Sequence, residues 1–143
     1  MTLIVLDDHL LRDLLSDEVT RTLRSLLKRN QPATTNLYYA RLCRSVVAAR
    51  GGQLTGSWTA ERRRELGAAL VALPDEFTIV PMRALAFRMA ELADSHRLSM
   101  LGAEAVAAAE HLGSPLCVWE GDDGPGIRAA AAAVGIRYRV IAR

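Results

Sequence analysis

Residues 3–8, Leu3-Ile4-Val5-Leu6-Asp7-Asp8, join an apolar run directly to two carboxylates, a combination that indicates the fold class of this chain. A short, nearly unbroken apolar run is typical of a strand that is buried on both faces of a parallel sheet. In open α/β sheets, ligands bind just beyond the carboxyl ends of the strands. The acidic pair therefore lies where a divalent cation could bind, provided that other segments bring further carboxylates to the same place.

Strand-like and helix-like segments alternate along the rest of the chain. We expect strands over residues 2–6, 33–36, 77–80, 116–119 and 137–141, separated by segments with helical spacing of apolar residues. Ser16 is predicted to cap a helix that has Asp17 and Glu18 in its first turn, and Thr59 or Ser57 is predicted to cap a later helix. This alternation predicts an α/β fold with a parallel sheet covered on both faces.

Composition indicates one domain over residues 1–143, which is long enough to form a core without disulfides or metal. Half of the residues are hydrophobic, but no apolar stretch is long enough to cross a bilayer, and the start of the chain has no signal-peptide pattern. We therefore expect a soluble, cytoplasmic protein with no membrane partner. The net charge of +2 is too small to indicate nucleic-acid binding by itself.

Several segments resemble, in order, the PIN-domain family, the fold of the VapC-type toxin ribonucleases. LIVLDDHLLRDLL is similar to the family's first strand, its catalytic aspartate and the following helix. FTIVPMRALAFRMAELADSHRLS resembles the middle strand, proline and helix, and LSMLGAEAVAAAEHLGSPLCVWEGDD resembles the helix with an Asp-Ala pair and the strand that ends in an acidic residue. GIRAAAAAVGIRYRVI is similar to the closing helix and strand. The resemblance implies a PIN-like three-layer α/β/α sandwich with a central parallel sheet of about five strands.

Family members hold Mg²⁺ or Mn²⁺ through about four acidic residues and cut RNA with metal-activated water, and the resemblance assigns these positions in this chain. Asp7 matches the first aspartate, and Glu120 matches the aspartate at the strand end. Arg41, in NLYYARLCR, falls where the family has glutamate, and Gly102 falls on the aspartate of the Asp-Ala pair. The resemblance therefore implies a site in which two acidic positions are kept and two are altered.

The altered positions are unfavourable for a metal ion. Arg41 reverses the charge of one ligand position and could instead form a charge-assisted pair with Asp7, while Gly102 supplies no ligand atom at all. Glu104 follows Gly102 by two residues, which turns it about 200° away on a helix and makes it a poor substitute.

Neighbouring acids could compensate in part for the altered positions. Asp8 is adjacent to Asp7, and Asp123 follows Glu120 closely in the glycine-rich segment GDDGPG, which also has the composition of an ordinary turn with a helix cap. The predicted metal ligands are therefore Asp7, Asp8, Glu120 and Asp123, binding Mg²⁺ or Mn²⁺ weakly.

Exposed arginines are candidates for contacts with phosphate or with an acidic partner. These candidates are Arg44, Arg62, Arg63 and Arg64. A run of three arginines is also typical of a solvated helix face. The two tryptophans, Trp58 and Trp119, could stack on bases, but a core role is favoured because aromatic residues are scarce in this chain.

Three functions follow from these observations. The first is a PIN-like pseudo-nuclease that acts by binding protein or RNA, with a second copy of itself (a homodimer) or an antitoxin-like regulatory protein as partner. The second is an active Mg²⁺- or Mn²⁺-dependent endoribonuclease that uses Asp7, Glu120 and Asp123 in catalysis, with Asp8 assisting. The third is an α/β module that binds a small molecule or nucleotide, supported by analogy of fold alone. The direction in which Arg41 points distinguishes the first function from the second.

Overall fold

A computed structural model describes residues 2–16, 19–48, 52 and 54–143 of the chain. In this part of the chain, five parallel strands form one sheet in the order β3-β2-β1-β4-β5. Their bounds are β1 Thr2–Leu6, β2 Asn30–Thr34, β3 Thr78–Ile79, β4 Leu116–Trp119 and β5 Tyr138–Ile141. The five-stranded parallel sheet predicted from the sequence is confirmed.

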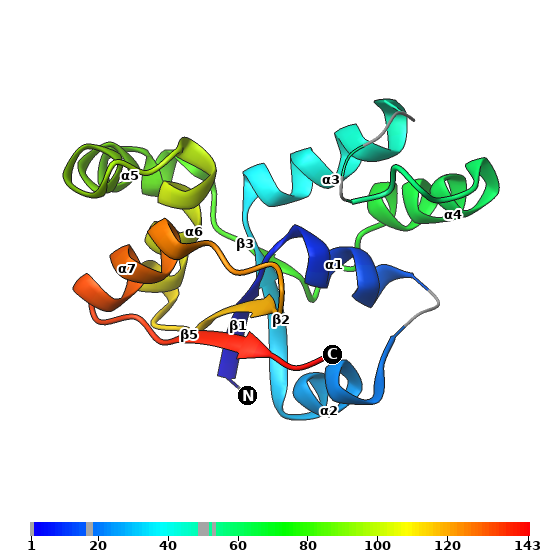
Figure 1. Ribbon diagram of the computed structural model, residues 1–143, viewed down its shortest axis with the longest axis horizontal. Coiled ribbons are helices and arrows are strands. Elements are labelled where there is room, and N and C mark those ends of the chain that lie inside the picture. The colour runs from blue at the N-terminus through cyan, green and yellow to red at the C-terminus, as the bar shows by residue number, and fades with distance from the viewer. Residues whose placement is uncertain (1, 17–18, 49–51, 53) are drawn as a thin grey trace.

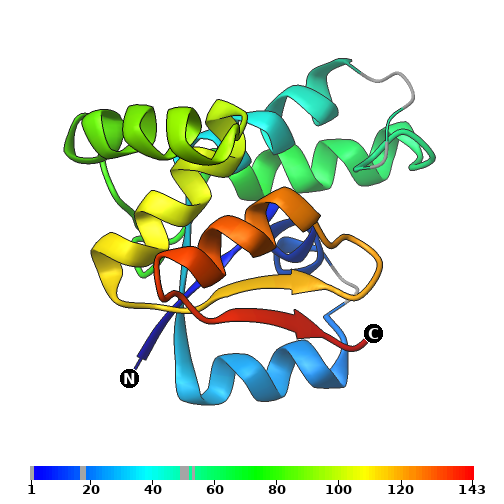
Figure 2. The ribbon, with the colours of Figure 1, turned by 60° about the vertical axis from the view of Figure 1, so that its left-hand side comes forward.

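Helices cover both faces of the sheet (Figures 1 and 2). They are α1 Asp8–Leu15, α2 Arg21–Arg29, α3 Asn36–Ala48, α4 Ala60–Val71, α5 Met82–His96, α6 Met100–Leu112 and α7 Pro125–Ala133. Helices α1 and α2 pack on one face, α6 and α7 lie on the other, and α5 packs against α6. The result is the three-layer α/β/α sandwich that the resemblance predicted. Helices α3 and α4 lie at the top of Figure 1, beyond the carboxyl end of β1.

Strand β1 is central to the core because it is buried on both faces. Ile4 and Leu6 pack with Leu10 of α1 and with residues of α2. Val5, on the opposite face, packs with Ala105 of α6. Alternate side chains of a strand point to opposite faces, so a strand between two helical layers needs an apolar residue at nearly every position. The apolar run that opens the chain meets this requirement.

The chain leaves β1 toward β2 on one side, and β4 later pairs with the other side of β1. This reversal of strand order creates a crevice at the carboxyl ends of β1 and β4, where open α/β sheets bind ligands. The backbone N–H of Asp7 donates to the carbonyl of Cys117 at 3.3 Å, so the first acidic residue is held against the end of β4.

Some predicted boundaries are wrong, for physical reasons. Ser16 ends α1 through its backbone N–H, which bonds to the carbonyl of Arg12, and α2 is capped by Thr20, whose hydroxyl accepts from the N–H of Leu23. Asp17 and Glu18 lie outside the described residues. The second strand begins at Asn30, earlier than predicted, because pairing with β1 outweighs the weak strand preference of its proline and asparagine. Of the two predicted caps for α4, Thr59 is the one observed.

No helix in the described ranges is long and apolar enough to cross a membrane.

Candidate functional site

A cavity of about 330 Å³ opens at the crevice between β1 and β4. Its polar lining comes from the start of α1, from α3, from the loop after β4 and from β5: Asp7, Asp8, His9, Tyr38, Arg41, Asp122, Asp123 and Tyr138. The structure thus brings together four of the residues singled out from the sequence, namely Asp7, Asp8, Asp123 and Arg41. Glu120 is exposed and does not line this cavity.

Asp7 is buried at the amino-terminal end of α1, where it serves as the N-cap. Its Oδ1 accepts the backbone N–H of Leu10 at 2.9 Å, and the residue is 3 % exposed. Burial raises the pKa of Asp7 to about 7, although the hydrogen bond from Leu10 opposes the shift. The carboxyl group is therefore partly protonated near neutral pH, which weakens it as a ligand for a cation.

Both carboxylate oxygens of Asp8 lie close to a polar group. Oδ1 accepts the backbone N–H of His9 at 3.0 Å and lies 3.1 Å from Nδ1 of the same residue. Oδ2 lies 3.1 Å from Nη1 of Arg41 but has no partner with hydrogen-bond geometry, so this contact is an ion pair without hydrogen-bond alignment. The guanidinium thus reaches into the acidic cluster, as the pseudo-nuclease hypothesis requires.

The partner of Arg41 differs from the one predicted, which was Asp7. Asp7 already uses Oδ1 to cap α1, whereas Oδ2 of Asp8 is directed toward α3. The side chain of Arg41 is half exposed while that of Asp8 is buried, so the ion pair forms at the mouth of the cavity.

His9 lies among the carboxylates, although no functional role was predicted for it. Its Nδ1 lies 3.9 Å from Oδ2 of Asp7, and its Nε2 lies 3.9 Å from Oδ1 of Asp122. Burial alone would lower the pKa of His9, but the hydrogen bond with Asp8 and the nearby carboxylates raise it overall. The positive charge of protonated His9 therefore offsets part of the negative charge in the cluster. Its position directly after two acids was the available sequence signal.

The position of Gly102 is closed by an apolar side chain from another helix. Gly102 is buried in α6, and a Cβ added there would lie 3.0 Å from Cγ1 of Ile127 and 3.4 Å from its Cδ1. Ile127, from α7, lines the cavity together with Leu101 and Val118. The cavity wall beside Gly102 is thus apolar, and no local sequence signal identifies Ile127 as the residue that packs there.

Glu104 is used elsewhere, as its predicted turn away from Gly102 implies. It is completely buried and accepts three hydrogen bonds at the start of α3: from the backbone N–H of Asn36 at 3.0 Å, from Nδ2 of Asn36 at 2.7 Å and from the backbone N–H of Leu37 at 2.7 Å. A carboxylate is favoured at a helix amino terminus, where backbone N–H groups lack partners. Glu104 therefore positions the helix that carries Tyr38 and Arg41.

Arginines already pair with the acids of the loop after β4. Oδ2 of Asp122 lies 3.0 Å from Nη2 of Arg143, and Oδ2 of Asp123 lies 3.4 Å from Nη1 of Arg128. Tyr138 accepts the backbone N–H of Gly124 at 3.1 Å and borders the cavity. Burial, together with a hydrogen bond to Asp123, raises the pKa of Tyr138 to about 12, so its hydroxyl stays neutral.

Two of the three consecutive arginines in α4 make contacts within the fold. Arg62 stacks on Trp58, with 3.6 Å between the guanidinium carbon and the ring centroid, and Arg63 bonds to the carbonyls of Thr55 and Trp58. Arg44 and Arg64 are exposed. None of the four predicted phosphate-contacting arginines lines the cavity. Trp119 is buried in the core, as favoured from the sequence.

The fit of this site to a metal ion is mixed. Asp7, Asp8 and His9 each offer a ligand atom, and these atoms lie within 4.8 Å of one another, so the group could hold a metal ion. The surroundings do not fit the Mg²⁺ or Mn²⁺ of a PIN-type nuclease. A guanidinium contacts Asp8, burial raises the pKa of Asp7, and the apolar side chain of Ile127 packs against Gly102. Hard cations prefer oxygen ligands, and the carboxylates of this cavity already have cationic neighbours, so we expect unassisted binding of the ion to be weak.

Comparison with known proteins supports the fold. No protein-family model matches the chain, and no curated protein matches it by sequence. Among solved structures, a chain from a toxin-antitoxin complex of Klebsiella pneumoniae is similar at 20% identity and a TM-score of 0.51, over 86% of this chain and 93% of that one. A crystallised protein from Pyrobaculum aerophilum is similar at 15% identity and a TM-score of 0.59, over 97% of this chain and 84% of that one. At these identities the likeness concerns the fold alone.

Proposed function

We propose that this chain is a single PIN-like domain, over residues 1–143, that does not cleave RNA with a metal ion and instead acts by binding a partner. The observation that carries the proposal is the ion pair between Arg41 and Asp8, with 3.1 Å between Nη1 and Oδ2. It puts a fixed positive charge at a position where the nuclease chemistry needs a negative one.

Charge and shape support the same conclusion. A guanidinium cannot lose its charge in a protein, so a dication that approached Asp8 would be repelled unless Arg41 moved away. Burial raises the pKa of Asp7 to about 7, so near neutral pH part of the population must lose a proton before Asp7 can bind a cation. Ile127 fills the place of a third ligand with carbon. These features come from three different helices, so a single side-chain movement does not restore the site.

We infer that the partner is a protein in the cytoplasm, either an antitoxin-like regulator or a second copy of the chain. Similarity to a chain of a toxin-antitoxin complex supports the antitoxin-like partner. Exposed apolar side chains support protein contact in general, and among the described residues Phe87 of α5 and Val71 of α4 are 81% and 91% exposed.

RNA cleavage tests the loss of activity. Purified protein is incubated with a mixed-sequence RNA and Mg²⁺ or Mn²⁺, and compared with Asp7→Asn and with EDTA. We expect no metal-dependent cleavage above that of Asp7→Asn. Robust cleavage by the natural chain that Asp7→Asn and EDTA both abolish would refute the proposal.

An active Mg²⁺- or Mn²⁺-dependent endoribonuclease is the second candidate, favoured by the convergence of Asp7, Asp8 and His9. For this function Asp7, Asp8, Glu120 and Asp123 remain the predicted ligands. Arg41 would have to leave Asp8 when the ion binds. This candidate predicts that Arg41→Ala increases Mn²⁺-dependent cleavage, whereas the proposed function predicts that it leaves cleavage at background.

A further inference from the structure

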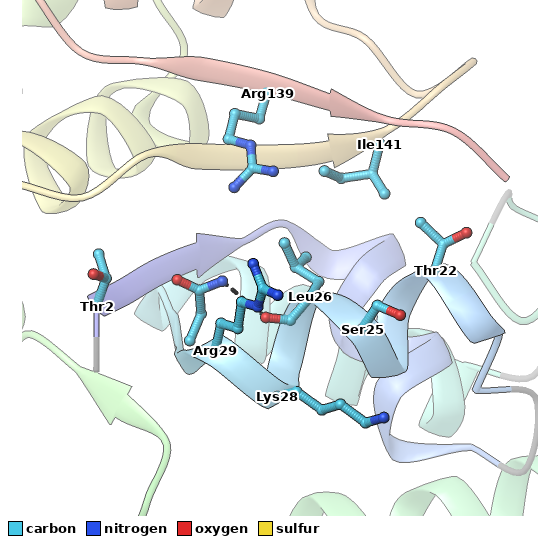
Figure 3. Close-up of a pocket in the computed structure, with 9 residues that line it drawn as sticks. Thr2, Thr22, Ser25, Leu26, Lys28, Arg29, Arg139 and Ile141 are labelled. Carbon is cyan, nitrogen blue, oxygen red and sulfur yellow. Dashed lines mark hydrogen bonds between the residues drawn. The ribbon is translucent and has the colours of Figure 1, made fainter.

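A second cavity, of about 770 Å³, lies between α2 and the edge strand β5 (Figure 3). It is lined by the first residue of β1, by one face of α2 and by Arg139 and Ile141 of β5. The acidic cavity lies beyond the other end of β1. The two cavities are therefore separate sites, and we call the second one the basic groove.

Two arginines face each other across the basic groove. Arg29 belongs to the last turn of α2, and Arg139 belongs to β5. Figure 3 shows their guanidinium groups directed into the same space from opposite walls, while the side chain of Lys28 points away from both. Like charges that converge in this way repel one another, so their position on two facing walls suits a shared anion.

Within the described residues, these cations have no acidic partner. No lining residue of the groove is acidic, and no ion pair joins Lys28, Arg29 or Arg139 to a carboxylate there. The contrast with Arg41, Arg88, Arg128 and Arg143 is clear, because each of those arginines lies beside a carboxylate. The charge of the groove is left for an external anion.

Hydroxyl groups accompany the two arginines. Thr22 and Ser25 line the groove from α2 at a spacing of three residues, which places them on one helix face, and Thr2 lines it from β1. Guanidinium groups with nearby hydroxyls are the donors that typically bind phosphate oxygens. The two apolar lining residues, Leu26 and Ile141, are 9% and 7% exposed, so they offer little surface to a partner.

We propose that the basic groove binds the phosphate backbone of a nucleic-acid strand without reading its sequence. An acidic protein segment is the less favoured ligand, because protein interfaces usually have an apolar or aromatic centre that this groove lacks. Base stacking is also not provided, since no aromatic residue lines the groove. Backbone contact alone predicts similar affinity for RNA and DNA of one sequence and strong weakening by salt.

Fluorescence anisotropy with labelled single-stranded RNA and DNA tests the inference, in EDTA so that cleavage plays no part. The groove variant is Arg29→Gln with Arg139→Gln. The matched control is Arg83→Gln with Arg97→Gln, which removes the same charge from exposed arginines outside the groove. We expect the groove variant to bind about tenfold more weakly, with a salt slope smaller by about 1.4, and the control to change by less than about threefold.

Competition by unlabelled anions against the labelled strand identifies which class of anion the basic groove binds. Inorganic phosphate at the same phosphate concentration should compete poorly, because a single group does not release several counterions at once. Poly-glutamate should compete worse than unlabelled RNA. Equal weakening in the groove and control variants would contradict the inference, as would poly-glutamate that competes as well as RNA. Circular dichroism of both variants shows that each is folded. The result is independent of the proposed function, because it concerns binding away from the acidic cavity.

Discussion

Gly102 and Ile127 pack closely against each other at the wall of the acidic cavity. A Cβ at position 102 would meet Ile127 at 3.0 Å, so the two residues are packed as a pair, although they belong to α6 and α7. Position 102 also follows the N-cap Ser99 by three residues, a place where an acidic side chain is favoured by the helix dipole. The backbone would thus accept an aspartate, but the side chain of Ile127 would have to shift to make room for it.

The single change Gly102→Asp should therefore destabilise the protein. Overpacking against Ile127 is expected to lower the free energy of unfolding by about 1–3 kcal/mol, measured by denaturant titration. When Ile127→Ala is already present, adding Gly102→Asp should lower the free energy of unfolding much less than it does in the natural chain. Additive losses in this comparison would show that the two side chains do not compete for space.

Restoring the acidic positions should create a divalent-metal site. Gly102→Asp, Ile127→Ala and Arg41→Glu in one chain replace the cation that contacts Asp8 by a carboxylate, and add a second carboxylate where Ile127 packs against Gly102. We expect Mn²⁺ affinity at least about tenfold above that of the natural chain by calorimetry. The control is Ile127→Ala with Arg41→Glu, which lacks the carboxylate at 102. Equal affinity in the triple variant and the natural chain would contradict the placement of these positions.

Among the helices and strands, α3 determines where Arg41 lies, and contacts at the start of α3 hold this helix in place. Glu104 of α6 accepts hydrogen bonds from the first residues of α3, and Nδ2 of Asn36 also donates to the carbonyl of Val80 at 2.8 Å. One buried carboxylate therefore ties α3 to α6, while the end of β3 is tied to α3. Arg41 reaches Asp8 because α3 is held at this angle.

Glu104→Gln should be strongly destabilising despite its similar shape. The amide lacks the negative charge and presents its own N–H groups to donors, so a loss of about 2–4 kcal/mol is expected in denaturant unfolding. Glu110→Gln is the matched control on the same helix, because Glu110 pairs with Arg88 at an exposed position, with 2.8 Å between Oε1 and Nε. Its loss should stay below about 1 kcal/mol. Similar losses in both variants would contradict the role given to Glu104.

At the scale of the whole molecule, a net charge of +2 conceals a separation of charge. Carboxylates gather at the cavity beyond the carboxyl end of β1, whereas the charged residues that line the basic groove, Lys28, Arg29 and Arg139, are all cations. The summed charge was therefore a poor guide to possible partners.

Protein stability should fall as the pH rises from about 4 to above 7. The pKa of Asp7 is raised from 3.8 to about 7, so the unfolded state loses this proton first and rising pH favours unfolding. The raised pKa of His9 acts in the same direction as the pH passes its ordinary value of 6.5. Asp7→Asn keeps a good helix cap and removes the titration, so its advantage over the natural chain should grow by about 2 kcal/mol between pH 5 and pH 8 in EDTA. Parallel stability curves for the two proteins would contradict the burial of the Asp7 charge.

Residue periodicity and chain order, which are local properties, predicted the parallel α/β sheet, the burial of β1 and the place of Asp7 and Asp8 at its carboxyl end. The resemblance to the PIN family, not periodicity, marked Arg41 and Gly102 as departures from an acidic pattern. Glu120 shows how far such prediction reaches. It was predicted as a metal ligand from its place at the end of β4, but its side chain is exposed and does not line the cavity.

Only the tertiary structure decided the partners of these residues. Arg41 faces Asp8, Ile127 closes the space beside Gly102, and Arg29 meets Arg139 across a groove. Each pair joins elements that are distant in the chain, and its members meet only when helices pack on the finished sheet. Periodicity predicts which face of a helix is buried, but the residue opposite it depends on packing angles and side-chain shapes that no local pattern records.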